Sequence, residues 1–256
     1  MPDSGLAASH RPPDFEDDPD DKLSLPVCHY RWIGSVSYEA ARQLQESLAL
    51  QIASGEVPPT LLLLEHPHTF TLGRRGQAQN ILWDEITQQQ RGVSVHWIDR
   101  GGDITYHGPG QLVGYPLLPL GTPSIQSETS RLPKADYVGY LRALEGLLIH
   151  TLAQFGVQGS RVEGKTGVWV QHSEHTEKIA SIGVKVDSRG ITRHGFALNV
   201  SPDMSYWQGI IPCGLPDDQM TSLELLLPSP PSIQQVTEAV IDAFRDRFHY
   251  RMVKYP

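Results

Sequence analysis

Apolar side chains recur at helical spacing in three segments of the chain. The first segment begins after Ser37, a residue that can cap a helix, and ends at Gly55 ahead of two consecutive prolines. The second covers residues 137–155 and is followed by a glycine. The third begins after Ser232, and Gln235 stands where it completes a capping box. The pattern therefore predicts three amphipathic helices.

Short apolar or alternating runs between these helices predict strands. They cover residues 60–65, 69–72, 93–97, 167–171, 178–186 and 191–200. Polar turns at 172–176 and 187–190 are expected to join the last three strands as hairpins, and residues 121–134, rich in Ser, Thr and Pro, predict a long surface loop. Because the helices are clustered between groups of strands, we expect an α+β fold with helices packed on a sheet. A doubly wound parallel sheet fits less well, since strict strand–helix alternation is missing.

The composition excludes several classes of protein. Of the 256 residues 39% are hydrophobic, and no apolar run approaches the roughly 18–20 residues of a membrane-spanning helix. Two cysteines are too few for a disulfide scaffold or a cysteine-rich zinc module. The net charge of −8 argues against general nucleic-acid binding, which requires a basic face. We therefore expect neither a membrane nor a nucleic acid as partner.

Most of the negative charge lies in residues 1–22. This segment has seven acidic and two basic residues, a net charge of −5, which leaves −3 for the other 234 residues. It is rich in proline and poor in large apolar groups, so we expect a disordered acidic tail followed by a single catalytic domain at 23–256. The tail resembles neither a secretory signal nor a transit peptide, and we expect a cytoplasmic protein with reduced thiols.

Two glycine-containing segments are candidates for ligand binding. Four glycines lie between Arg100 and Gln111, together with Tyr106 and His107, and glycine lets a backbone approach a ligand closely. A strand–turn–strand that needs glycine for its bends explains the same composition. The spacing does not match the dinucleotide fingerprint or the P-loop. In residues 194–200 small and large apolar residues alternate, which would line a narrow apolar channel or pack a sheet.

Cys213 is the candidate nucleophile, because it lies between proline and glycine where an apolar run breaks. Alternatively, the thiol of Cys213 is buried and unreactive, as most single cysteines are. A cysteine reacts as thiolate, and lowering its pKa from about 8.5 by one to two units takes roughly 1.4 to 2.7 kcal/mol. Lys178 is a candidate cation for this purpose, although a lysine there is also typical of a solvated strand end. His107 and His194 are further candidates, and sequence separation does not decide among them.

No metal or other cofactor is expected. The nearest histidine groupings are His66 with His68 and His172 with His175. The first has no carboxylate or Cys partner at ligand spacing, and the second lies in a polar hairpin tip, where we expect solvated side chains. The HExxH pattern is absent from the sequence. The second cysteine, Cys28, follows the tail and has no distinctive context.

Seven segments together resemble the octanoyltransferase family of lipoate biosynthesis, the lipoyl(octanoyl) transferases. They are GSVSYEAARQLQ at 34–45, LEHPHTFTLGRR at 64–75, RGGDITYHGPGQ at 100–111, GVWV at 167–170, KIASIGVKV at 178–186, HGFALN at 194–199 and IIPCGL at 210–215. The matches occur in order over about residues 30–250. The acidic tail and the loop at 121–134 depart from the family pattern, and they leave partner docking undetermined.

The resemblance implies a fold shared with biotin and lipoate protein ligases, a mixed sheet flanked by helices. It places Cys213 where the family carries its acyl-thioester nucleophile, and Lys178 where the family carries the lysine that lowers the pKa of that thiol. The segments matching those around the bound acyl chain give the substrate-binding residues Arg100, Gly101, Gly102, Asp103, Ile104, Thr105, Tyr106, His107, Ser181, Ile182, Gly183, Gly195, Phe196 and Ala197.

The implied reaction is the transfer of an octanoyl group from octanoyl-acyl carrier protein to a lysine of a lipoyl domain, without ATP. The acceptors would be the lipoyl domains of the 2-oxoacid dehydrogenase and glycine cleavage complexes. Acyl carrier proteins are acidic, so we expect a local basic patch despite the net negative charge. Its candidate members are Arg74, Arg75, Arg100, Arg131, Arg142 and Arg193.

Two other functions fit parts of the pattern. A lipoate- or biotin-type ligase would activate a free acid with ATP and would need no cysteine, whereas Cys213 and the lack of a phosphate-cradling lysine loop favour the transferase. A non-catalytic protein that binds acyl groups or lipoyl domains would use Cys213 only for packing, and slow labelling of the thiol at neutral pH would favour it.

Overall fold

The computed structural model describes residues 25–122, 134–172, 174–212 and 218–255. Three features predicted from the sequence lie outside these residues: the acidic tail at 1–22, most of the loop at 121–134, and the nucleophile Cys213.

The centre of the molecule is a mixed sheet of eight strands in the order β13-β1-β2-β6-β12-β11-β10-β9. β1 is parallel to β13 and β2, and all the other neighbouring pairs are antiparallel. The strands are β1 (Val27–Ser35), β2 (Thr60–Glu65), β6 (Gln111–Leu117), β9 (Gly159–Val162), β10 (Lys165–His172), β11 (His175–Val186), β12 (Thr192–Asn199) and β13 (Arg251–Lys254). The α+β fold with a mixed sheet is therefore confirmed.

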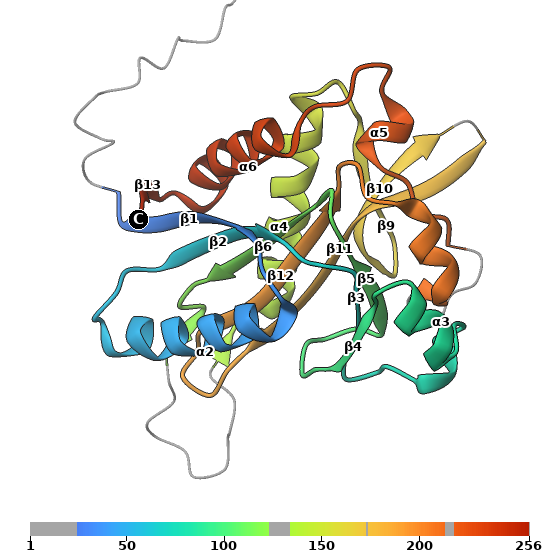
Figure 1. Cartoon of the computed structure of the whole chain (residues 1–256). Coiled ribbons are helices and arrows are strands. Elements are labelled where there is room, and N and C mark those ends of the chain that lie inside the picture. The colour runs from blue at the N-terminus through green and yellow to red at the C-terminus, as the bar shows by residue number, and fades with distance from the viewer. Residues whose placement is uncertain (1–24, 123–133, 173, 213–217, 256) are drawn as a thin grey trace, which may run out of the picture.

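A smaller sheet lies beside one end of the large one (Figure 1). Its order is β4-β3-β5, with β4 (Ser94–Trp97), β3 (Thr69–Leu72) and β5 (Ile104–His107). A separate short pair, β7 (Gly121–Thr122) and β8 (Lys134–Ala135), brackets residues 123–133. β3 follows β2 closely in sequence, so the chain passes directly from the large sheet into the small one.

Helices cover both faces of the large sheet (Figure 1). α4 (Tyr137–Ala153) and α6 (Ile233–Phe248) pack on one face with Leu61 and Leu63 of β2, and α2 (Tyr38–Ser54) packs on the other face with Leu62 and Leu64. The four consecutive leucines are buried because both faces of β2 are covered. The shorter helices are α3 (Glu85–Gln90), α5 (Leu223–Leu226), η1 (Ala78–Asn80) and η2 (Met204–Gly209). None of the helices described is long and apolar enough to cross a membrane.

The local signals in the sequence match the observed ends of the helices. The Ser37 side chain accepts a hydrogen bond from the N–H of Ala40, and Gly55 ends α2 in the left-handed conformation with φ of 79°. The capping box of Ser232 and Gln235 is present at the start of α6. Trp97, the last residue of the strand predicted at 93–97, is 62% exposed. It belongs to β4, which lies at the edge of the small sheet.

Candidate active site

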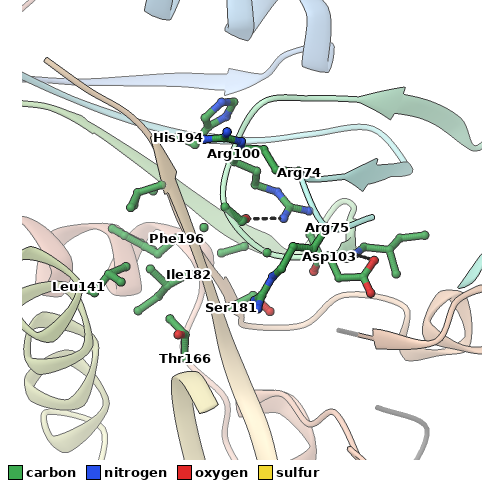
Figure 2. Close-up of a pocket in the computed structure, with 18 of the residues that line it drawn as sticks. Arg74, Arg75, Arg100, Asp103, Leu141, Thr166, Ser181, Ile182, His194 and Phe196 are labelled. Carbon is green, nitrogen blue, oxygen red and sulfur yellow. Dashed lines mark hydrogen bonds between the residues drawn. The ribbon is translucent and has the colours of Figure 1, made fainter. Parts of the chain in front are cut away.

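One cavity of about 980 Å³ opens where β11 and β12 of the large sheet face the small sheet. Figure 2 shows the side chains that line it. Thirteen of the fourteen predicted substrate-binding residues line this cavity, together with Lys178. They are Arg100, Gly101, Gly102, Asp103, Ile104, Thr105, His107, Ser181, Ile182, Gly183, Gly195, Phe196 and Ala197. Segments far apart in the sequence thus converge on a single site.

Tyr106 is the exception, because successive side chains of a strand point to opposite faces. Thr105 and His107 face the cavity, whereas Tyr106 turns into the core of the small sheet. There its hydroxyl lies 2.9 Å from Nδ1 of His68, and its ring stacks on Tyr206 at 5.2 Å between centroids. The structure therefore gives Tyr106 a packing environment instead of a place in the cavity wall.

The loop at residues 100–103 is held between two neighbours by its backbone. N–H groups of residues 73–75 donate to carbonyls of this loop at 3.0 to 3.1 Å, and the N–H of Gly101 donates to the carbonyl of Val184 at 3.0 Å. A Cβ on Gly73 would lie 2.5 Å from the carbonyl oxygen of Gly102. Glycine is required at position 73 because the two backbones run so close together.

Arg100 extends from this loop across β11 and is only 7% exposed. A Cβ on Gly183 would lie 2.8 Å from Cδ of Arg100, so the glycine leaves room for the crossing. The guanidinium donates to the carbonyl and the hydroxyl oxygen of Thr71 at 2.7 and 2.9 Å, and to the carbonyl of Gly101 at 3.0 Å. Arg100 is thus a buried cation that several oxygen acceptors fix against the cavity wall.

A chain of buried polar side chains runs from His107 in the cavity wall into the interior. Nδ2 of Asn199 donates to the carbonyl of Thr221 at 2.9 Å, so its Oδ1 accepts from Nε2 of Gln111 at 2.9 Å. Oε1 of Gln111 then accepts from Nδ1 of His107 at 2.8 Å. Burial lowers the pKa of His107 well below its ordinary value. The imidazole is therefore neutral near pH 7 and carries its proton on Nδ1.

Lys178 is buried at 4% exposure within β11, so it is not at a solvated strand end. Its ammonium nitrogen lies 5.3 Å from the centre of the Trp169 ring, a cation–π contact. The backbone of Lys178 also binds a second segment of chain. Its N–H donates to the carbonyl of Gln219 at 2.8 Å, and its carbonyl accepts from the N–H of Thr221 at 3.0 Å.

The described residues on both sides of the Cys213 segment are firmly held. On the N-terminal side, the N–H of Ile211 donates to the carbonyl of Asn80 at 2.8 Å. On the C-terminal side, Asp218 lines the cavity and accepts from the ammonium of Lys165 at 2.5 Å. Only residues 213–217, outside the described part of the chain, separate Pro212 from Asp218.

Apolar side chains line one part of the cavity. Leu141 of α4, Ile182 of β11 and Phe196 of β12 lie together, opposite the charged side chains of the 73–75 and 100–103 segments (Figure 2). The Phe196 ring lies over Gly114, where a Cβ would approach ring carbons to 2.2 Å. The cavity thus joins an apolar region to a polar rim, as a ligand with an apolar tail and a polar head requires.

Histidines and tyrosines form a buried cluster at the cavity, of which the sequence indicated only His194 as a candidate. Tyr38, Tyr115 and His194 line the cavity, and His66 contacts two of them, with its Nε2 2.7 Å from the hydroxyl of Tyr115 and its ring 5.2 Å from the Tyr38 ring. A hydrogen bond from His194 and the ammonium of Lys185 hold the pKa of Asp99 well below its usual range. The HPH sequence at 66–68 is the local signal of this cluster, but it does not show that tyrosines from other segments lie beside His66.

This cluster should make the protein less stable in mild acid. Burial lowers the pKa of His66 from 6.5 to about 4, so the unfolded chain binds a proton between these pH values and the folded chain does not. Stability is then lost as the pH falls through this window, by about 2 kcal/mol between pH 7 and pH 5 from His66 alone. Urea unfolding midpoints at the two pH values measure it. His66→Asn should reduce the difference by about 2 kcal/mol, the share of His66, while the other buried histidines keep theirs. An unchanged difference in that variant would contradict the assignment.

The six arginines proposed as a basic patch do not form one surface. Arg74, Arg75 and Arg100 line the cavity, whereas Arg142 pairs with Glu145 and Arg193 with Asp99; Arg131 lies outside the described residues. Around the cavity, the Arg74 and Arg75 guanidinium groups have no ion pair with a described carboxylate. We call Arg74 and Arg75 the basic rim of the cavity.

The described residues contain no group of three or more His, Cys, Asp or Glu side chains that could hold a metal ion. Cys28 is fully buried in the core between the large sheet and α6. Burial raises the pKa of its thiol to about 12. Cys28 is therefore uncharged near neutral pH and is not a nucleophile, which leaves Cys213 as the one candidate among the two cysteines of the sequence.

Comparison with known proteins gives consistent matches over most of the chain. The family model of the lipoyl protein ligase A/B catalytic domain matches residues 37–245. The octanoyltransferase of Acidobacterium capsulatum is 47% identical over 203 residues, 78% of this chain and 81% of that protein. The octanoyltransferase of Chloroflexus aggregans is 42% identical over 230 residues, 90% of this chain and 97% of that protein.

A solved structure of a bipartite lipoate protein ligase from Thermoplasma acidophilum matches with a TM-score of 0.63 at 16% identity, covering 90% of this chain and 88% of that one. At this identity the match shows a shared fold. The expected likeness to lipoate protein ligases is therefore confirmed.

Proposed function

Because the chain belongs to the lipoyl protein ligase A/B catalytic domain family and, within it, to the octanoyltransferases, we propose that it moves an octanoyl group from octanoyl-acyl carrier protein to a lysine of a lipoyl domain. The chain is an acyltransferase. The observation that carries the proposal is the buried ammonium of Lys178, in the wall of a cavity with an apolar region and beside the chain that follows residues 213–217. The acceptors would be the lipoyl domains of 2-oxoacid dehydrogenase and glycine cleavage complexes, in the cytoplasm.

The first step forms a thioester on Cys213. The thiolate attacks the carbonyl carbon of the donor thioester, and the tetrahedral oxyanion is stabilised by backbone N–H groups of a glycine-containing loop. The bond to the sulfur of the carrier arm breaks, and this sulfur leaves as a thiol with a proton from the Lys178 ammonium. Lys178 thereby performs two tasks: its charge lowers the pKa of the Cys213 thiol before attack, and its proton neutralises the leaving group.

The second step moves the acyl group to nitrogen. The lysine amine of the lipoyl domain attacks the thioester carbonyl, its proton passes to the now neutral amine of Lys178, and Cys213 leaves as thiolate. The product is an amide and the enzyme returns to its starting state. Conversion of a thioester to an amide is downhill, so no nucleotide is needed.

The apolar region of the cavity would select the chain length. About six buried methylene groups at roughly 0.8 kcal/mol each supply some 5 kcal/mol before the cost of ordering the chain. Leu141, Ile182 and Phe196 supply the apolar contacts in this region.

Transfer without nucleotide is the test of this function. Purified protein is incubated with octanoyl-acyl carrier protein and an apo lipoyl domain, and the lipoyl domain is weighed by mass spectrometry. We expect an octanoyl amide on its lysine without ATP, and none from free octanoate with ATP. Modification that requires free octanoate and ATP would instead identify a ligase, and no modification in either case would reject both functions.

The basic rim predicts how the donor binds. Replacing both Arg74 and Arg75 with glutamine should raise the KM for octanoyl-acyl carrier protein by about tenfold at low ionic strength, because two attractive charges are lost. The effect should fade as salt screens the charges, while kcat stays nearly constant. Arg245→Gln, which removes an exposed arginine on α6, is the control. Equal KM values for the double variant and the control at low salt would exclude steering by the rim.

A further inference from the structure

Gly167 lies directly under the side chain of Lys178. It has a φ of 126°, which L side chains rarely adopt. A Cβ at this position would lie 2.6 Å from Cε of Lys178 and 2.6 Å from the carbonyl oxygen of Ala180. Neither neighbour has room to move freely, since Ala180 is backbone of β11 and Lys178 is buried. The aliphatic part of Lys178 therefore takes its course because position 167 has no side chain.

A buried carboxylate holds the Gly167 peptide in place. The Glu145 side chain on α4 is only 1% exposed, and its Oε1 accepts from the N–H of Gly167 at 3.3 Å. Its Oε2 accepts from Arg142 at 2.7 Å and from Arg161 at 2.9 Å. The two guanidinium groups offset the charge that Glu145 carries into the interior.

The irregular pairing of β10 explains why Gly167 needs such a partner. The register between β10 and β11 shifts between Val168 and Trp169, where Trp169 pairs with Lys178. At such a bulge the ladder is disrupted, and a backbone N–H has to find its acceptor elsewhere. Glu145 supplies that acceptor from the helix packed behind the strand.

We propose that Glu145 and Gly167 are positioning residues for the reaction, which together set the course of the Lys178 side chain and so the place of its ammonium group. Glu145 fixes the Gly167 peptide, and the bare Cα of Gly167 forms the surface over which Lys178 passes. The inference rests on the proposed function, in which Lys178 acts on Cys213.

Other charged groups near Lys178 belong to the neighbouring elements. Lys165 of β10 places its ammonium 5.0 Å from the centre of the same Trp169 ring, and it is paired with Asp218. Glu177, next to Lys178 on β11, pairs with His172. Gly167→Ala changes none of these charges, so a changed pH profile in that variant would report on Lys178 itself, whereas a substitution of Glu145 also removes the charge that pairs with Arg142 and Arg161.

The experiment measures the rate of Cys213 acylation by octanoyl-pantetheine as a function of pH, by mass spectrometry of the intact protein. In Gly167→Ala the rate at pH 7 should fall at least about tenfold, and the pH midpoint should rise by about one unit as the ammonium moves away from the thiol. Gly156→Ala is the matched control. Gly156 also has a positive φ, of 75°, but a Cβ there meets nothing within 4 Å, so its pH profile should not move.

A double-mutant cycle separates positioning from a general loss of structure. In a Lys178→Ala background the contact with the carbonyl of Ala180 remains but the Lys178 side chain is gone, so Gly167→Ala should slow acylation several-fold less than it does in the wild-type background. Equal effects of Gly167→Ala with and without Lys178 would overturn the proposal. Glu145→Gln keeps an acceptor oxygen for the N–H of Gly167 and is the control for the lost charge. Glu145→Ala should raise the midpoint relative to Glu145→Gln, and equal midpoints in the two folded proteins would also overturn the proposal. If Lys178→Ala itself has the wild-type pH profile of acylation, Lys178 does not act on Cys213, and the proposed function is wrong in this respect.

Discussion

Substitution of Cys213 by alanine is expected to reduce octanoyl transfer by about 10⁴- to 10⁶-fold, the range typical of removing a covalent nucleophile. Without this sulfur no acyl-enzyme can form, and the cavity retains only its ability to bind the acyl chain. The loss is measured as the rate of amide formation on an apo lipoyl domain. Mass spectrometry of wild-type protein with donor alone should show one octanoyl group, located on the peptide that contains residue 213.

Cys28→Ala provides the control for this experiment. Cys28 is buried in the core, and burial raises the pKa of its thiol to about 12, so its removal should leave the transfer rate within about twofold. Cys28→Ala should instead lower the free energy of unfolding, because a small buried side chain is lost. Octanoyl transfer by Cys213→Ala at the wild-type rate, or an adduct located on another residue, would refute the covalent mechanism.

Replacement of Lys178 by methionine should slow transfer by about 10³-fold or more. Part of this loss comes from the thiol, because a pKa returned to about 8.5 leaves only a few per cent of thiolate at pH 7. The rest comes from the lost proton donor and acceptor, which typically contributes 10²- to 10⁴-fold. Methionine keeps an unbranched apolar side chain of similar length at this buried position, so the fold should be retained. Single-turnover acylation and amide formation, measured separately, show both contributions.

Lys185→Met is the matched control for Lys178→Met. Lys185 lies on the same strand, but it pairs with Asp99 and does not line the cavity. The same substitution there should change transfer by less than about threefold, as removal of a partly exposed ion pair costs little. Similar losses in the two variants would show that Lys178 has no special role.

Much of the fold could be predicted because the local signals agree with the tertiary structure. The helix from Ser37 to Gly55 has a cap, an apolar stripe and a left-handed end, and each of these is present in α2. The two hairpins from β10 to β12 follow from polar turns between apolar runs. Such features depend on residues that are close in sequence, so the sequence pattern is enough to predict them.

Other features depend on contacts between distant segments, which no local pattern records. β1 and β13 lie side by side although they are at opposite ends of the chain, and neither was predicted. Tyr106 belongs to a matched motif, yet strand alternation turns it away from the cavity. The contact between Gly167 and Lys178 could not be predicted, because it depends on a bulge in the β10–β11 ladder.

The ionisation of the Cys213 thiol is the property on which the mechanism depends. It can be titrated through its ultraviolet absorbance in protein carrying Cys28→Ala, so that a single thiol is observed, with and without Lys178→Met. A nearby cation should give Cys213 a pKa at or below about 7, and Lys178→Met should return it toward about 8.5. A pKa near 8.5 in both proteins would contradict the pairing of Cys213 with Lys178.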